Sequence, residues 1–247
     1  MIIEQVRDKF VDFCQKRNSD TAQCIVVTPL SPDEAIGAKA DREFAIKKGK
    51  ERVIDAAFGD ARGQAFTDRP AAFSGTLKEV LALEVSDPRY RAIFVAALNA
   101  VMRSHGAAGG TVHCRDEDPK RCGPQLARTL EERHGKTRVG LVGFQPAILA
   151  ALVDRFGQDN VRVVDLNPDN IGETKSDVPI WDGRTDLPRL VKWSGIGLAT
   201  GSSIVNGTID EIHRRYTEAG KPVVYFGTTI SGPAALLGLD RLCPFGA

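Results

Sequence analysis

The sequence predicts a two-domain α/β protein, with an α+β domain over residues 1–125 and a Rossmann-like, doubly wound parallel sheet over residues 126–247. Two observations carry this prediction. Strand and helix patterns alternate from about Arg138 onward, which is the rhythm that a parallel sheet with crossover helices requires. The first half mixes strands and helices without that rhythm, so the boundary should fall between His113 and Arg138.

Apolar spacing and capping residues predict the elements of the first half. Apolar residues at helical spacing predict an amphipathic helix over Ile2–Lys16, and a β-branched run predicts a strand over Gln23–Thr28. Ser31-Pro32-Asp33-Glu34 has the layout of a capping box, so a short helix should begin there. The remaining predicted elements are paired strands over Arg52–Phe58 and Gly63–Thr67, a helix from Lys78, and a helix that Asp87-Pro88 opens and that continues to Met102.

The second half is predicted from alternating apolar strands and amphipathic helices. In chain order these are strand Val139–Val142, helix Pro146–Phe156, strand Val161–Leu166, strand Ile196–Thr200, helix Asn206–Ala219, strand Val223–Phe226 and helix Pro233–Leu237. The polar stretch Asn167–Arg189 should be irregular and should rim a crevice.

Composition limits the classes of partner. The 247 residues are 42% apolar, contain no run long enough to span a bilayer and begin without a signal-peptide pattern, so we expect a cytoplasmic protein without a membrane partner. The net charge is +1, from 33 basic and 32 acidic residues, which argues against nucleic acid as a partner. Five cysteines, an odd number, do not suggest an exported disulfide framework. A homo-oligomer is compatible with the sequence, which does not decide the oligomeric state.

Three predicted strands end in turns of small, hydroxyl-bearing residues. The turns are Gly140–Gly143, Thr200–Ser203 and Gly227–Thr229, and the middle one leads into Asn206-Gly207-Thr208. Free backbone N–H groups and a helix N-terminus favour a carboxylate or phosphate, so a small anionic ligand is predicted here. The alternative is helix capping by Asn206 or Thr208. The predicted ligand-binding residues are Asp165, Thr200, Gly201, Ser202, Asn206, Thr208, Thr228 and Arg115.

The first of these strand ends does not suit a dinucleotide. Gly140-Leu-Val-Gly143 is shorter than the dinucleotide fingerprint, and Pro146 lacks the N–H that a pyrophosphate would need at the helix start. Asp165 nevertheless stands some twenty residues on, where a carboxylate could accept a hydrogen bond from a ribose hydroxyl. The alternative is that the glycines allow close packing and that Asp165 caps a turn before Pro168.

The segment from His113 to Cys122 combines metal-ligand side chains with acidic residues. Imidazole and thiolate are ligands that zinc and softer metals prefer, so His113, Cys114 and Cys122 are the candidate ligands of a divalent metal ion, with Cys243 as a further thiol. Arg115 could instead pair with an anionic ligand. The spacing matches no zinc knuckle, and a solvated acidic turn between the domains is the alternative.

Lys50 and Glu51 follow a glycine and precede an apolar strand, where side chains could reach an interdomain cleft. Burial could shift their pKa values toward proton transfer, although a surface ion pair is the commoner role for such neighbours. They are the candidate catalytic residues only because Gly-Lys-Glu is one of the motifs of the family resemblance given below. The sequence has no Gly-x-Ser-x-Gly elbow, Walker loop or His-Glu-x-x-His motif. Serine hydrolases, P-loop enzymes and zincins are therefore disfavoured.

Short motifs along nearly the whole chain follow a distinctive order. They are Ala35-Ile-Gly37, Gly49-Lys-Glu51, Gly63–Asp68, Asn99-Ala100, Thr111–Asp116, Asp165-Leu-Asn167 with Asn170-Ile-Gly172, and Thr200-Gly-Ser202 with Val205–Thr208. With them the chain resembles the putative heavy-metal chelation family. The resemblance implies an enolase N-terminal-like domain joined to a Rossmann-like domain, with a site between them, and it implies no established reaction.

Three hypotheses of function follow. The first is binding of a small anionic or metal-chelating ligand in an interdomain crevice, by an enzyme of heavy-metal or metallocofactor metabolism. The second is an enzyme that uses an adenosyl cofactor such as S-adenosylmethionine at the Gly140–Gly143 and Asp165 strand ends. The third is a non-catalytic carrier of a small ligand or metal.

Overall fold

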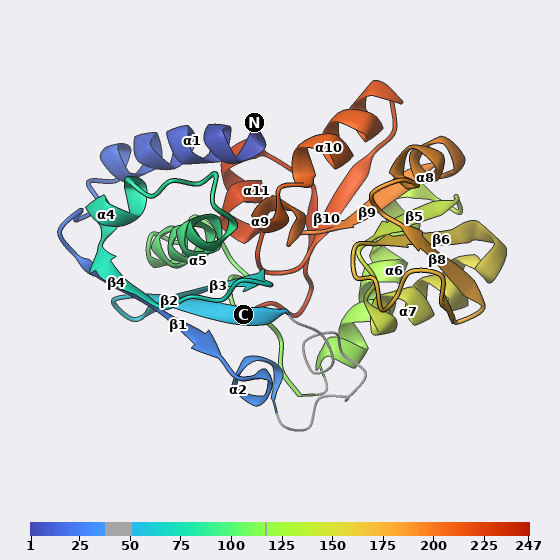
Figure 1. The fold of residues 1–247 in the computed structure, drawn as a ribbon, viewed down its shortest axis with the longest axis horizontal. Helices are drawn as coiled ribbons and strands as arrows, with labels where there is room; N and C mark the ends of the chain where they lie inside the picture. The colour runs from blue at the N-terminus through green and yellow to red at the C-terminus, as the bar shows by residue number, and fades with distance from the viewer. Residues whose placement is uncertain (38–50, 117) are drawn as a thin grey trace.

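The computed structural model describes residues 1–37, 51–116 and 118–247. Within these residues the chain forms two sheets, one of four antiparallel strands and one of seven mostly parallel strands, with helices packed around both (Figure 1). The predicted α/β fold class is confirmed.

The first sheet has the strand order β3-β2-β1-β4 and packs against helix α5. The elements of this part are α1 (Ile2–Lys16), β1 (Cys24–Leu30), α2 (Pro32–Ile36), β2 (Arg52–Phe58), β3 (Ala61–Thr67), β4 (Phe73–Thr76), α4 (Leu77–Leu81) and α5 (Pro88–Ser104). The predicted capping box is present, because Ser31 Oγ accepts from Glu34 N while Glu34 Oε2 accepts from Ser31 N.

Helix α5 is the centre of the molecule. Every residue from Arg91 to Met102 is buried, as expected for a helix with partners on all sides. One face lies on β2 and β3, and other faces contact α9 and α11. The approach to β3 is very close, since a Cβ at Gly63 would lie 2.2 Å from Ala100 N.

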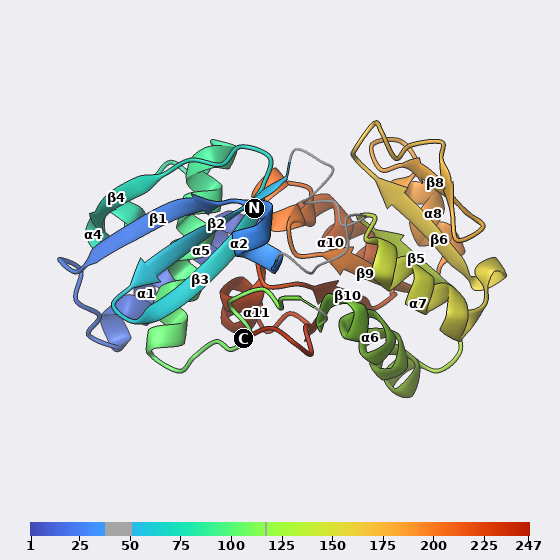
Figure 2. The same ribbon diagram turned by 90° about the horizontal axis from the view of Figure 1, so that it is seen from below.

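The second sheet has the order β11-β10-β9-β5-β6-β8-β7. Its part of the chain contains α6 (Asp118–His134), β5 (Val139–Val142), α7 (Pro146–Phe156), the short 3₁₀ helix η1 (Gln158–Asn160), β6 (Val161–Asp165), β7 (Thr174–Lys175), β8 (Val178–Asp182), α8 (Leu187–Trp193), β9 (Ile196–Thr200), α9 (Ser203–Asn206), α10 (Ile209–Glu218), β10 (Val223–Phe226), α11 (Ser231–Leu237) and β11 (Arg241–Leu242). Without β7, the parallel strands numbered in chain order run 3-2-1-4-5-6 from β8 to β11, which is the order of doubly wound nucleotide-binding sheets. Helices α6 and α7 cover one face and α8 and α10 the other (Figures 1 and 2).

Two local predictions were wrong. The stretch 167–189 is not irregular, because it contains β7, β8 and the start of α8. Pro179 interrupts the strand pattern of β8 in the sequence. In the structure Pro179 pairs only with Thr174 of the short edge strand β7, where the missing N–H costs little stability. The predicted helix Asn206–Ala219 is two helices, since Gly207 adopts a left-handed φ of 86° and ends α9.

The two parts of the chain share one hydrophobic core. Its buried residues come from α1, β1, β2 and α5 on one side and from α9, α10 and α11 on the other. The domain boundary predicted between residues 125 and 126 lies within α6 and stays a prediction. Among the described helices, none is long and apolar enough to cross a membrane.

Candidate functional site

The carboxyl ends of β5 and β9 meet where the strand order of the second sheet reverses. In open α/β sheets, ligands bind outside the carboxyl ends of the strands at this point. Gly143 follows β5 with a φ of 92°, and a Cβ there would lie 2.7 Å from Thr200 Cγ2 after β9. Only glycine combines this φ with so close an approach, so the two predicted turns are in contact.

The first sheet comes close to this edge of the second sheet. Phe66 N of β3 donates to Thr229 Oγ1, which follows β10, over 3.0 Å. The β2–β3 pairing places Arg52 opposite Thr67, so the next residues outward, Glu51 and Asp68, lie at the same end of the sheet. Glu51 and Asp68 interact electrostatically with each other, and Glu51 also with Asp165 at the end of β6. We call Glu51, Asp68 and Asp165 the carboxylate cluster.

Glu51 is the titratable member of the carboxylate cluster. Burial, then the charge of Asp165, then the charge of Asp68 raises the pKa of Glu51 from 4.5 to about 7. Desolvation and like charges both disfavour the ionised carboxylate. A carboxyl group with such a pKa can take up or release a proton at neutral pH, as acid/base catalysis requires.

Asp165 also holds two loops together. Its carboxylate accepts from Phe144 N over 2.6 Å, from Asn167 N over 2.7 Å and from Asn170 Nδ2 over 3.3 Å. The predicted turn-capping role is therefore present. These donors compete with a ribose hydroxyl for the same oxygens, and Gln145 Oε1 caps the N-terminus of α7 by accepting from Ile148 N.

The turn from Thr200 to Thr208 is closed largely by its own side chains. Ser202 N donates to Thr200 Oγ1 over 3.3 Å. Asn206 Oδ1 accepts from Thr208 N over 3.0 Å and from Thr208 Oγ1 over 2.7 Å. Gly201 is buried, and a Cβ there would lie 2.8 Å from a methyl carbon of Ile230. Thr208, the N-cap residue of α10, makes no side-chain capping hydrogen bond, and Asn206 bonds to Thr208 and not to an N–H within the helix. The capping alternative is therefore not borne out in these bonds, and ligand binding by these residues stays a prediction.

Neighbouring threonines after β10 differ in their hydrogen bonds. Thr228 and Thr229 are both 1% exposed. Thr229 Oγ1 accepts from Phe66 N, whereas Thr228 Oγ1 has no partner among the described residues. A buried hydroxyl without a partner costs free energy, so Thr228 retains a polar group that the fold itself does not use.

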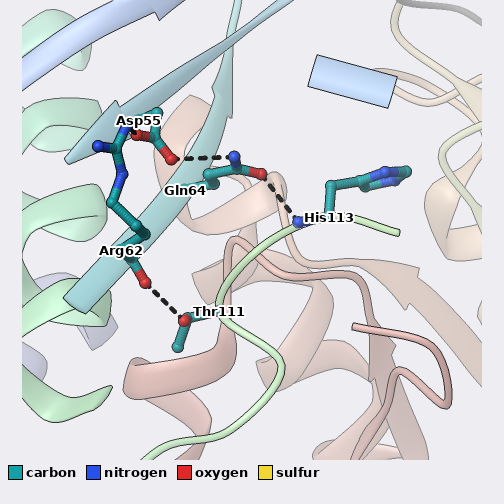
Figure 3. A network of polar contacts seen from close by, with 5 residues as sticks. All are labelled: Asp55, Arg62, Gln64, Thr111 and His113. Carbon is teal, nitrogen blue, oxygen red and sulfur yellow. Dashed lines mark hydrogen bonds and ion pairs between the residues drawn. The ribbon is translucent and has the colours of Figure 1, made fainter. Parts of the chain in front are cut away.

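Main-chain and ring contacts fix His113. Its N–H donates to Gln64 Oε1 over 2.8 Å, and Gln64 Nε2 donates to Asp55 Oδ1 over 2.9 Å (Figure 3). The ring Nδ1 contacts the carbonyl of Cys114, so Nδ1 is the protonated nitrogen and Nε2 keeps its lone pair. Burial lowers the pKa of the imidazole, which keeps it neutral. The ring packs edge-on against Phe66 with centroids 5.3 Å apart.

The thiols of Cys114 and Cys122 share a hydrogen bond, with Cys243 near both. The bond raises the pKa of Cys114, as does burial, and lowers the pKa of Cys122. Among the described residues no group of three His, Cys, Asp or Glu side chains is arranged to hold a metal ion. The metal roles of His113, Cys114 and Cys122 therefore stay predictions.

The other two predicted site residues lie apart from these contacts or outside the description. Lys50 belongs to the part of the chain outside the described residues. Arg115 is exposed, and its Nη2 lies 3.5 Å from the carbonyl of Asp33 beside α2. Pairing of Arg115 with an anionic ligand stays a prediction.

Sequence reasoning missed a buried polar seam between the two sheets. Asn99 of α5 is fully buried; its Nδ2 lies 2.9 Å from Gln64 O and 3.0 Å from Thr229 O, and its Oδ1 accepts from Gly232 N over 2.7 Å. Thr111 Oγ1, also buried, donates to Arg62 O over 2.7 Å (Figure 3). The available signal was a single amide inside an otherwise apolar helix. The polar seam is Gln64, Asn99, Thr111 and Thr229.

The sequence was compared with models of known protein families and with curated proteins. Residues 126–238 match a family model described as "Putative heavy-metal chelation". The match covers less than half of the chain and makes this part similar to that family. The predicted resemblance to the putative heavy-metal chelation family is thereby confirmed. A search of curated proteins gave no match.

Two solved structures from the putative heavy-metal chelation family are similar to the chain. One, a protein of unknown function from Pyrococcus horikoshii, is 17% identical with a TM-score of 0.52, over 93% of this chain and 79% of that one. The other, a protein of unknown function from Desulfitobacterium hafniense DCB-2, is 12% identical with a TM-score of 0.48, over 75% of this chain and 72% of that one. The first likeness supports the fold and nothing beyond it.

Proposed function

We propose that the carboxylate cluster binds a metal ion, alone or as the complex of a small chelating ligand, and that Glu51 exchanges a proton with what is bound. Because the three carboxylates are not arranged to hold a metal ion in the described structure, the proposal requires them to draw together when the metal binds. The raised pKa of Glu51, at a strand start that faces the end of β6, is the observation that carries this proposal. The family match supports metal or ligand binding in the coarse sense.

The chemistry of the surrounding donors fits a cation better than an anion. The carboxylates of Asp165 and Asp68 each repel that of Glu51, and a cation beside Glu51 offsets that repulsion. Neutral His113 is a further candidate donor through Nε2, because its Nδ1–H is held by a backbone carbonyl. The structure thus favours the metal-bearing form of the predicted ligand over a simple anion.

Proton exchange follows from the pKa of Glu51. A metal ion must displace the proton that Glu51 holds below pH 7, so binding should strengthen as the pH rises. A bound chelating ligand that loses a proton on coordination could deliver it to the same carboxylate. In an enzyme of metal metabolism, Glu51 would be the acid/base residue.

Titration with Co²⁺ tests the proposal, because the absorption spectrum of bound Co²⁺ distinguishes thiolate from oxygen and nitrogen ligands. We expect tighter binding at pH 8 than at pH 6, and at least tenfold weaker binding, without that pH dependence, in Glu51→Gln. Glu211→Gln removes an exposed carboxylate paired with Arg215 and should bind like the parent. Equal affinity of Glu51→Gln and parent, or a thiolate-to-cobalt band, would overturn the proposal; the latter would favour Cys114 and Cys122.

A further inference from the structure

Both tryptophans of the chain lie in one basic hollow, far along the sequence from the first sheet. A hollow of about 440 Å³ is lined by Arg162, Trp181, Arg189, Lys192 and Trp193. Trp181 lies on β8, Trp193 ends α8, and Arg162 is near the start of β6. The chain contains no other tryptophan. We call these residues, together with Arg138, the tryptophan hollow.

Guanidinium groups stack on both indole rings. The Cζ atom of Arg189 lies 4.0 Å from the ring centroid of Trp181. Those of Arg162 and Arg138 lie 5.0 Å and 5.6 Å from the ring centroid of Trp193. Attraction between a guanidinium and the face of an aromatic ring restricts where each of these side chains can lie. The guanidinium groups are therefore restricted in position before any ligand arrives.

These cations are not neutralised within the fold. In the described part of the chain, Arg138, Arg162, Arg189 and Lys192 have no carboxylate partner. Arg162 Nη1 donates to the carbonyls of Gln158 and Val161 over 3.1 Å and 2.7 Å, but these neutral oxygens leave its positive charge uncompensated. Two guanidiniums around one indole repel each other, and an anion between them relieves the repulsion.

We propose that the tryptophan hollow binds a diphosphate group, either as free pyrophosphate or within a nucleoside diphosphate. Three guanidinium groups and an ammonium match two adjacent phosphates in charge, and the guanidinium N–H groups that the fold does not use can donate to phosphate oxygens. The volume is that of a site for a small ligand. None of the residues that line the tryptophan hollow belongs to the carboxylate cluster. Arg138 and Arg162 stand at the amino ends of β5 and β6, whereas Trp181 pairs with Val164, the residue before Asp165.

Intrinsic fluorescence tests the proposal directly, because all indole emission of the protein comes from the tryptophan hollow. The protein is titrated with pyrophosphate and with ADP, excited at the red edge of indole absorption where adenine is transparent. We expect a saturable change with at least one of them at a concentration at least tenfold below that needed with acetate, and weaker binding as the salt concentration rises. Similar affinities would identify the diphosphate alone as the ligand, and tighter binding of ADP would add a contribution of the base.

Two double variants, each of which removes two arginines, distinguish binding at the tryptophan hollow from an effect of the protein's overall charge. Arg162→Gln with Arg189→Gln should weaken binding at least tenfold. Arg128→Gln with Arg214→Gln removes two exposed cations that pair with Glu132 and Glu218, and should change it less than twofold. If the first double variant does not fold, Arg189→Gln alone should weaken binding at least threefold. The proposal would be overturned if no saturable change were seen, or if acetate bound as well as diphosphate. It would also be overturned if both double variants lost affinity equally, or if a single-stranded oligonucleotide bound more tightly than ADP.

Discussion

The polar seam and the carboxylate cluster are both polar regions between the two sheets, yet their polar groups are satisfied differently. Asn99 in the polar seam is fully buried, and both ends of its amide are hydrogen-bonded. Glu51 in the carboxylate cluster is partly buried and faces the like charges of Asp165 and Asp68. A fully paired buried network stabilises a unique fold, whereas crowded like charges oppose folding.

The difference suggests what each region does for the protein. Residues that only hold a structure together gain from complete pairing, and residues that meet a ligand often remain strained or incompletely paired until it arrives. We therefore expect substitutions in the polar seam to lower stability strongly. Substitution of Glu51, which has crowded like charges, should leave stability unchanged or raise it.

The largest effect should come from Asn99→Leu in the polar seam. Leucine has a similar volume but leaves the carbonyls of Gln64 and Thr229 and the N–H of Gly232 buried without partners. Each such group costs about 1–3 kcal/mol, so the free energy of unfolding should fall by about 4 kcal/mol. Urea unfolding followed by circular dichroism measures this loss.

Asn170→Leu is the matched control for Asn99→Leu beside the carboxylate cluster. Asn170 is partly buried, and its Nδ2 makes one long bond of 3.3 Å to Asp165. We expect a loss of less than about 1 kcal/mol. Equal losses for the two asparagine variants would show that the polar seam and the carboxylate cluster do not differ as described.

The next effect concerns the pH dependence of stability at Glu51. The folded pKa of about 7 exceeds the ordinary value of 4.5, so between these pH values the folded state binds more protons than the unfolded state. Stability from Glu51 is then fully present below pH 4.5 and is lost as the pH rises through 7. Relative to the parent, Glu51→Gln should therefore gain at most about 3 kcal/mol between pH 5 and pH 8.

Urea unfolding of parent and Glu51→Gln at both pH values tests this sign. The difference between the two proteins cancels the contribution of every other titrating group. Glu211→Gln, in which an exposed carboxylate is removed, should keep the pH dependence of the parent. A constant difference between Glu51→Gln and parent across this range would contradict the raised pKa.

Local patterns predicted most of the fold because its elements are locally encoded. The helix Ile2–Lys16 was predicted with the bounds that α1 has, and the capping box of Ser31 and Glu34 forms as its spacing indicates. Strand β8 was missed because Pro179 breaks the strand pattern, although Pro179 pairs only with the short edge strand β7, where a missing N–H is tolerated. The position of a strand within a sheet is a tertiary property that its own residues do not specify.

The candidate site was harder to predict because its contacts join distant segments. Glu51 was predicted because Gly49-Lys-Glu51 belongs to the family resemblance, but its raised pKa depends on Asp165, more than a hundred residues away, and on Asp68, to which the Gly63–Asp68 motif assigned no role. Asn206 and Thr208 were predicted as ligand-binding residues from composition, and their side chains bond to each other. The residue type shows which hydrogen bonds a side chain can form, and the fold determines whether its partner is another side chain or a ligand.

The smallest effect compares Thr228 with Thr229, which have the same burial and different hydrogen bonds. Thr229→Val removes the acceptor of Phe66 N, which lies in the contact between the two sheets, so it should lower the free energy of unfolding by about 1–2 kcal/mol. Thr228→Val removes a hydroxyl that has no partner among the described residues, so it should raise the free energy of unfolding by about 1 kcal/mol. Urea unfolding of both variants measures the two signs. Natural selection retains a destabilising hydroxyl where a function depends on it, so a gain in Thr228→Val would mark Thr228 as a residue kept for what it binds. A loss equal to that of Thr229→Val would instead assign both threonines to the structure.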